Sequence, residues 1–388
     1  MKDENLVKIS NLPELNILRG IAALFMIINH ASYKLLPSRL TTEGIFGTIT
    51  FIGSFAPVLF FFITGIGYGL QDGQKKKKNY WLNIIYKTFI LCLADQFLFW
   101  REGQLIGLNF LGFIGFSIMI MGLIRVSKQP LIYALILAFS SILLRYILGS
   151  YLENKLDVSG LIIWLLGTKG LSNISYPFSP WITYPCFGYI FGIFLKHNYE
   201  KIEKIKIKDI LRFILVIVTL GLVTYFLWTK NLSFHRWGTV AIAFYVASIL
   251  VLSIVIVVLY FIKIYSFSNL LEHYIGLRGV SSLAIVPIHY GLISILSIVG
   301  FNNLNPLIFV AIVLLISYVS FFCADRVESW GLSLVRVWPT QRILYTGLTL
   351  AAVCAIITRI SLPENSFVLV VTITTGQILL CLLLTLRW

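Results

Sequence analysis

The sequence predicts an all-α protein, a polytopic membrane bundle of about ten to twelve transmembrane helices. Hydrophobic residues make up 58% of the chain and charged residues only 12%, against about 25% charged in an average soluble protein. Apolar runs of about twenty residues, the length that crosses a bilayer core of roughly 30 Å, recur along the whole chain. Clusters of lysine and arginine fall between alternate pairs of these runs.

The chain begins with a polar segment, residues 1–12, that lacks the pattern of a cleavable signal peptide. We expect this segment to be cytoplasmic, and 1–388 to form a single integral-membrane domain. The sequence "SGLIIWLLG" at 159–167 is too short to cross the bilayer and predicts an interfacial or re-entrant piece. The apolar runs that predict spans are 15–36, 47–70, 81–100, 105–124, 130–149, 181–196, 209–229, 238–262, 279–299, 306–324, 343–360 and 366–386.

The basic residues determine the predicted orientation. They cluster in alternate loops, at 75–78, 125–128, 196–208 and 326–342, whereas 300–305 has none. By the positive-inside rule these loops, and therefore both termini, are cytoplasmic. The net charge of +15 comes largely from the basic residues of these loops. It therefore indicates membrane topology and not a nucleic-acid surface.

Two ionisable residues share one face of the first span. In "LRGIAALFMIINH" at 18–30, Arg19 and His30 are eleven positions apart, which is three helical turns plus about 20° and about 16 Å along the axis. Such groups are costly inside a bilayer unless they face protein or water, so they mark candidate functional sites. Near the cytoplasmic side Arg19 would hold an anionic ligand, and farther out His30 would accept a proton or carry an acyl group. Singly, each also fits a structural explanation, a snorkelling arginine and a buried histidine.

The same stretch resembles the first helix of the transmembrane acyltransferase superfamily, whose hallmark is an arginine and a histidine separated by ten residues. The superfamily includes the acyltransferase 3 family and the relatives of heparan-α-glucosaminide N-acetyltransferase. "FAPVLFFFITGIGYGL" at 55–70 resembles the second helix of the superfamily, and 108–124 and 180–195 resemble later spans. The resemblance is best over 12–195.

The resemblance implies an acyl-CoA-dependent acyltransferase that moves an acetyl group from cytoplasmic acetyl-CoA to a cell-surface or lumenal glycan or glycolipid. O-acetylation is favoured, with N-acetylation possible. Arg19 and His30 match the functional positions, the first on the CoA side and the second as catalytic base or acyl carrier. Lys75 and Lys76 stand where acyltransferase 3 members often carry arginines and would attract the CoA phosphates, although a lysine run is equally a topology signal. Asn16 replaces the residue that is usually acidic.

A second copy of the motif occurs in "LRGVSSLAIVPIH" at 277–289, with Arg278 and His289 at the same spacing. Duplication and chance both explain it. We expect His289 to line the catalytic cavity and Arg278 to lie on the cofactor side, and we predict that both copies run outward from the cytoplasm. Asp95, in the third span, would either orient a catalytic histidine or cap its own span.

Other classes of function remain open at this point. A transporter or flippase for a polar lipid or solute would also use intramembrane arginine and histidine, but it should show broken half-helices and inverted repeats. A scaffold would leave Arg19 and His30 unexplained. The cysteines have no paired spacing, so no metal site is predicted. We expect a bacterial cytoplasmic membrane, and the oligomeric state is open.

Overall fold

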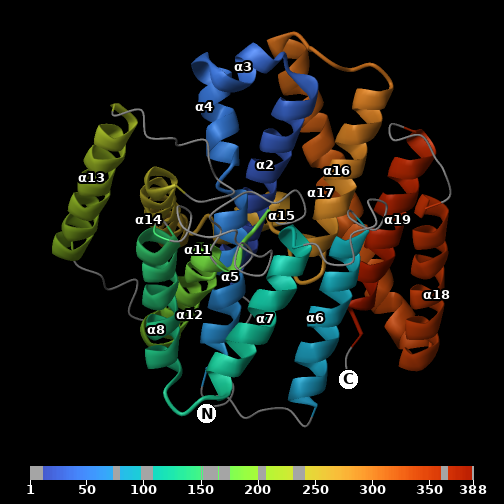
Figure 1. Ribbon diagram of the computed structural model, residues 1–388, viewed down its shortest axis with the longest axis horizontal. Coiled ribbons are helices and arrows are strands. Elements are labelled where there is room, and N and C mark those ends of the chain that lie inside the picture. The colour runs from blue at the N-terminus through green and yellow to red at the C-terminus, as the bar shows by residue number, and fades with distance from the viewer. Residues whose placement is uncertain are drawn as a thin grey trace. The chain divides into compact units, whose positions relative to one another are not determined.

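The computed structural model describes residues 12–72, 79–97, 108–149, 151, 165, 175–199, 207–229, 241–359 and 366–386. All the secondary-structure elements of these residues are helices (Figure 1), which confirms the predicted all-α class. Residues 1–11 and most of 159–167, for which a cytoplasmic segment and an interfacial piece are predicted, lie outside the described residues.

Each predicted run has a helical counterpart. Eight helices are long and apolar enough to cross a membrane, and three shorter apolar helices accompany them. The chain is therefore an integral membrane protein. The eight are α2 (Pro13–Leu35), α4 with α5 (Gly44–Gly53, Ala56–Leu70), α8 with η2 (Pro130–Leu143, Leu144–Leu148), α11 with α12 (Phe178–Trp181, Thr183–Asn198), α14 (Ile242–Ile264), α16 (Ser281–Ile298), α17 (Pro306–Val337) and α18 (Thr340–Arg359). The others are α7 (Phe110–Val126), α13 (Ile207–Thr229) and α19 (Phe367–Leu383), with α6 (Tyr80–Gln96) filling the remaining run.

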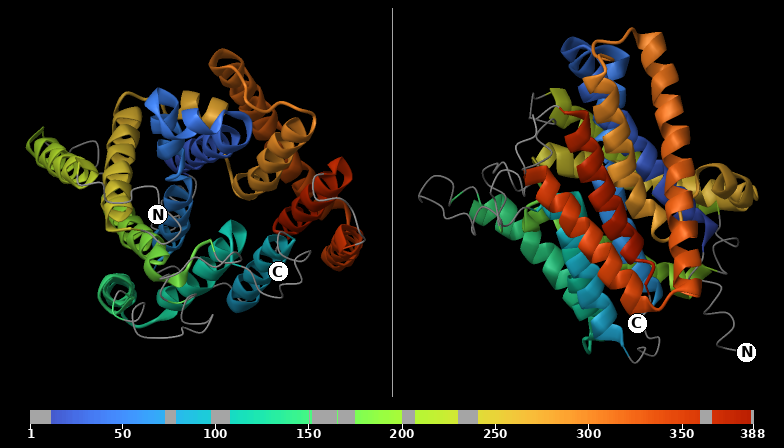
Figure 2. Two further views of the ribbon diagram at one scale, coloured as in Figure 1. Left: turned by 45° about the horizontal axis from the view of Figure 1, so that its top comes forward. Right: turned by 90° about the vertical axis from the view of Figure 1, so that its right-hand side faces the viewer.

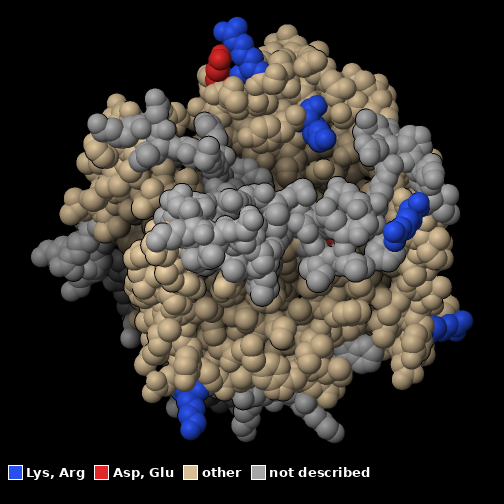
Figure 3. Space-filling view, viewed as in Figure 1, with Lys and Arg blue, Asp and Glu red and all other residues tan. Residues whose placement is uncertain are grey.

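The outer surface is suited to lipid. On the face shown in Figure 3, the residues that the structure describes are almost all uncharged, with a few scattered lysines, arginines and acids. Large apolar side chains such as Leu215 on α13 and Leu314 on α17 are more than 60% exposed. In water such exposure would be costly, whereas in hydrocarbon it costs nothing.

The described helices belong to two compact units. The first contains residues 1–18, 58–75 and 117–276, and the second contains 19–57, 76–116 and 277–388. In the first unit, α5 and α12 approach closely because glycines face each other's backbone. A Cβ on Gly65 would lie 1.9 Å from the carbonyl oxygen of Pro185, and one on Gly188 would lie 1.9 Å from that of Phe62. Only glycine fits these two positions, as in other close helix pairs within membranes.

The second unit contains most of α2, with α3 (Ser38–Thr42), α4, α6, the first turns of α7, and α16 to α19. Within it α16 packs against α17 and α19, and α19 packs against α18 and α6 (Figures 1 and 2). Helix α17 starts with Asn305 as N-cap, whose side-chain oxygen accepts a hydrogen bond from the Leu307 N–H at 3.0 Å, followed by Pro306 in the first turn. Its 32 residues span about 48 Å, which exceeds the bilayer core of about 30 Å.

Candidate functional site

The histidines of the two motif copies meet in the second unit. His30 on α2 and His289 on α16, separated by 259 residues in sequence, place Nδ1 and Nε2 respectively 2.9 Å apart. The rings are nearly coplanar, with 13° between their planes and 5.1 Å between their centres. His289 is buried, with 1% of its surface exposed, whereas His30 is half-buried. This is the most distinctive polar contact among the described intramembrane residues.

The hydrogen-bond network determines which ring nitrogen carries each proton. His289 Nδ1 lies 2.7 Å from the carbonyl oxygen of Ile285, which can only accept, so Nδ1–H donates. In a neutral ring the other nitrogen, Nε2, is then an acceptor, and the Nδ1–H of His30 donates to it. His30 is left with a lone pair on Nε2, which makes that atom the base or nucleophile of the pair.

The half-buried His30 is held by its neighbours on α2, α4 and α16. The rings of Tyr290 and His30 are nearly perpendicular, with the centres 5.5 Å apart and the planes at 86°. One residue before His30, the Asn29 side-chain amide donates to the Thr50 carbonyl of α4 at 2.9 Å. Gly53 permits the close contact of these helices, because a Cβ there would lie 2.7 Å from the Phe25 carbonyl oxygen. The position of the His30 ring is therefore fixed from several sides.

Arg19, eleven residues before His30, lies near an acidic residue of another helix. The Glu328 carboxylate of α17 interacts electrostatically with Arg19. The same carboxylate accepts a hydrogen bond at 2.9 Å from the backbone N–H of Ser281, the first residue of α16. A helix N-terminus and an arginine both favour a negative charge, so Glu328 connects α2 to the start of α16.

Two links therefore join α2 and α16, one at Glu328 and one at the histidine pair. From Arg19 to His30 is about 16 Å, and from Ser281 to His289 about 12 Å, in the same direction along both helices. The two motif copies are thus parallel within the unit, as their predicted outward course requires. Their direction relative to a membrane stays a prediction.

The arginines of the two copies are not equivalent. Arg19 is inside a helix, whereas Arg278 precedes α16 in a turn and is exposed. The next residue, Gly279, has φ of +44°, and a Cβ there would lie 2.5 Å from the Glu328 Oε1. The glycine of the second copy therefore allows the backbone to turn and lets the Glu328 carboxylate come close. A CoA-binding role for Arg278 stays a prediction, and Lys75 and Lys76 lie outside the described residues.

Asp95 lies at the end of α6, is 1% exposed, and is bonded to the start of α7. Its Oδ2 accepts from the Asn109 N–H at 2.6 Å, and the backbone of Leu111 and Gly112 also bonds to the carboxylate. The first N–H groups of a helix have no hydrogen-bond acceptor within the helix. The Asp95 carboxylate accepts from three such groups, so it caps α7. The sequence predicted either a cap of the aspartate's own span or a residue that orients a catalytic histidine, and the second role stays a prediction. No group of three possible metal ligands gathers among the residues that the structure describes.

A known protein family matches a large part of the sequence. The sequence profile described as "Heparan-alpha-glucosaminide N-acetyltransferase, catalytic" matches residues 12–230, which is more than half of the chain. The chain belongs to this family. This membership confirms the prediction of a transmembrane acyltransferase-like family. A relationship to the acyltransferase 3 family stays a prediction. No curated protein and no solved structure matches the chain. The matched range contains Arg19 and His30, and His289 lies beyond it.

Proposed function

We propose that the chain transfers an acetyl group from cytoplasmic acetyl-CoA to a glycan or glycolipid on the other side of a bacterial cytoplasmic membrane, with His30 as the reacting residue. One observation carries this proposal. The bonds of 2.9 Å and 2.7 Å through His289 to the Ile285 carbonyl leave the lone pair of His30 on Nε2. His30 also lies within the range that matches a family of acetyltransferases.

In the direct route, His30 acts as general base. Its Nε2 takes the proton of the acceptor's hydroxyl or amine as the acceptor's oxygen or nitrogen attacks the thioester carbonyl carbon. A tetrahedral intermediate forms, the carbon–sulfur bond breaks, and the CoA thiolate leaves. The proton on Nε2 then passes to the sulfur, which restores the neutral ring.

In the acyl-carrier route, His30 acts as nucleophile. Its Nε2 attacks the thioester carbon, the CoA thiolate leaves, and an acetylimidazolium remains on His30. The acceptor attacks this acetyl group, the carbon–nitrogen bond breaks, and the acceptor's proton goes to the released thiolate or to water. Both routes place a positive charge on the His30 ring.

His289 stabilises that positive charge without touching the substrate. When His30 becomes cationic, its Nδ1–H···Nε2 bond to His289 becomes charge-assisted, and such bonds are about twice as strong as neutral ones. Ile285 in turn fixes the His289 tautomer. This is the orienting function that the third group of a catalytic triad has. His289 is therefore a positioning residue.

On the donor side, Arg19 is the candidate contact for the anionic part of CoA. Its guanidinium already interacts with Glu328, so a CoA phosphate would share the cation with this carboxylate. Because Glu328 also holds the start of α16, phosphate binding at Arg19 would act on the helix that carries His289. Arg19 thus connects donor binding to the position of the histidine pair.

The family description indicates which chemical group of the acceptor receives the acetyl group. It names an N-acetyltransferase that acts on a glucosaminide, which favours the amine of an amino sugar over the hydroxyl favoured from sequence. Glucosamine and N-acetylglucosamine separate these possibilities, because only glucosamine has a free amine. Label on glucosamine alone indicates N-acetylation, and label on both indicates O-acetylation.

The test is acetyl transfer in proteoliposomes that contain the full chain, with radiolabelled acetyl-CoA outside and either sugar inside. The wild type should label the enclosed sugar, and His30→Ala should not. His273→Ala is the matched control, because His273 is an exposed histidine on α15 (Ser268–Ile275). Transfer that survives in His30→Ala would refute the assignment. Rapid quenching without acceptor separates the two routes, since only the acyl-carrier route leaves label on the protein.

The transporter alternative has less support. It predicts helices broken near the middle of the membrane and an inverted repeat. Helices α2 and α16 are each continuous, α16 even across Pro287, and the two motif copies are parallel.

A further inference from the structure

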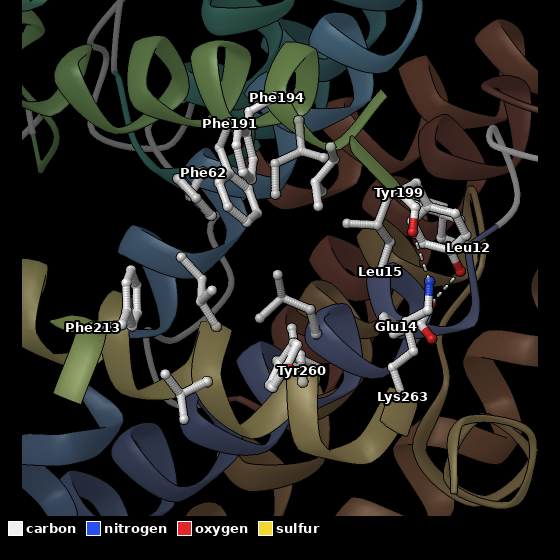
Figure 4. Close-up of a pocket in the computed structure, with 16 residues that line it drawn as sticks. Leu12, Glu14, Leu15, Phe62, Phe191, Phe194, Tyr199, Phe213, Tyr260 and Lys263 are labelled. Carbon is white, nitrogen blue, oxygen red and sulfur yellow. Dashed lines mark hydrogen bonds between the residues drawn. The ribbon is translucent and has the colours of Figure 1, made fainter. Parts of the chain in front are cut away.

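The first unit contains a cavity of about 440 Å³ that the proposed chemistry does not use. It lies among the first turns of α2 and helices α5, α12, α13 and α14, and Figure 4 shows the side chains around it. Most of its wall is aliphatic or aromatic, including Leu15, Phe62, Phe191, Phe213 and Ile256. Its volume falls within the range of about 300–1,000 Å³ that holds a small organic ligand.

The polar groups of this cavity gather at one end. Figure 4 shows Glu14, Tyr199 and Lys263 together, away from Phe62, Phe191 and Phe213. The Tyr199 hydroxyl donates to the Glu14 carboxylate at 3.4 Å. Lys263 Nζ lies 3.1 Å from the centre of the Tyr199 ring and 3.4 Å from the Tyr199 carbonyl oxygen.

Glu14 is also fixed from a second side, because the Ser268 hydroxyl donates to its Oε1 at 2.8 Å. An ammonium and a carboxylate therefore lie at one end of an apolar cavity, each held by neighbouring groups. This arrangement offers one charge of each sign to the head of a ligand and hydrocarbon contacts to its tail.

We propose that this cavity binds a membrane phospholipid with a zwitterionic head, phosphatidylethanolamine. An acyl chain would fill the apolar part, the phosphate would lie near Lys263, and the ammonium near Glu14. An anionic phospholipid would gain the same contact with Lys263 but would lack a partner for Glu14. Acetyl-CoA fits poorly, because its nucleotide and phosphates would meet apolar walls and a carboxylate. The cavity is therefore a lipid site, and this inference does not depend on the proposed acetyl transfer.

A bound lipid would join the start of α2 to helices far away in the chain. Leu15 and Leu18 of α2 line the cavity together with residues of α12 and α14. A ligand that binds only the folded chain stabilises it by mass action. Phosphatidylethanolamine should therefore raise the melting temperature of the delipidated protein more than phosphatidylglycerol does.

The experiment is native mass spectrometry of the delipidated full chain, titrated with phosphatidylethanolamine or phosphatidylglycerol of the same acyl composition. The wild type should bind one phosphatidylethanolamine about fivefold more tightly, which is about 1 kcal/mol. Glu14→Gln should abolish this preference, whereas Lys263→Gln should weaken the binding of both lipids. Equal affinities in the wild type, or a preference that survives in Glu14→Gln, would overturn the proposal.

A second pair of variants tests the cavity without changing a charge. Ile256→Trp fills part of the cavity and should weaken the binding of both lipids at least tenfold. Leu314→Trp is the matched control, since Leu314 is 65% exposed on α17 and outside the cavity. The two variants should elute and melt like the wild type in detergent. Unchanged lipid binding in Ile256→Trp, or displacement of the lipid by acetyl-CoA, would show that the lipid does not occupy this cavity.

Discussion

Replacement of His289 by alanine removes the acceptor of the His30 Nδ1–H and should slow catalysis while leaving substrate binding nearly unchanged. The bond concerned is 2.9 Å long and becomes charge-assisted when the His30 ring is cationic. A hydrogen bond to a charged group contributes about 1.5–3 kcal/mol. Since about 1.36 kcal/mol corresponds to a tenfold change in rate, we expect kcat to fall about 10- to 150-fold.

The assay for this prediction is the initial rate of acetyl transfer in proteoliposomes over a range of acetyl-CoA concentrations. His289 acts through His30 and not on the substrate, so KM should change less than twofold. His289→Gln should recover part of the rate, because its amide oxygen is an acceptor of similar reach. A folded alanine variant that keeps kcat within twofold of the wild type would refute the reasoning.

The burial of His289 makes a stability control necessary. The side chain is 1% exposed, so its truncation leaves a small cavity and should lower the unfolding free energy by about 1–3 kcal/mol. Melting curves of the variants separate this loss from the loss of rate. His273→Ala, at an exposed histidine, should change neither quantity.

Three further predictions concern Glu328, Arg19 and Asp95. Glu328→Gln should lower kcat severalfold without a large loss of stability, because the amide still accepts from α16 but no longer attracts Arg19. Glu43, an exposed acid between α3 and α4, gives the control Glu43→Gln, and equal rates in the two variants would contradict the link. Arg19→Ala should raise the KM for acetyl-CoA severalfold in the same assay, and an unchanged KM would exclude a donor contact. Asp95→Ala should lower the unfolding free energy by about 1–2 kcal/mol, as loss of a helix cap does, with kcat retained. A large loss of kcat without destabilisation would instead support a catalytic aspartate.

The helical fold and the shared helical face of Arg19 and His30 could be predicted from sequence because both depend on local patterns. Apolar runs of span length correspond to helices throughout the described residues. The spacing of Arg19 and His30 places them on one helical face whatever surrounds them. The repeat of that spacing at Arg278 and His289 drew attention to the second histidine, whose ring contacts that of His30.

The partners of these residues could not be predicted, because they depend on how distant helices pack. Glu328 is far from Arg19 in sequence, and only the contact of α17 with α16 brings it to Ser281. The repeat also conceals a difference, since the first "LRG" is helical and the second forms a turn. Asp95 likewise caps a helix that follows a loop, and sequence spacing alone does not indicate which backbone N–H groups a carboxylate reaches.

The protonation of the two ring nitrogens of His30 tests the central claim most directly. Solid-state ¹⁵N spectra of histidine-labelled protein in proteoliposomes distinguish a nitrogen that carries a proton from one that has a lone pair, and His30→Gln identifies the signals. At a pH where the ring is neutral, we predict a proton on Nδ1, coupled to His289, and a lone pair on Nε2. A neutral ring with its proton on Nε2, or with no coupling to His289, would contradict the assignment of His30 as the reacting base or nucleophile.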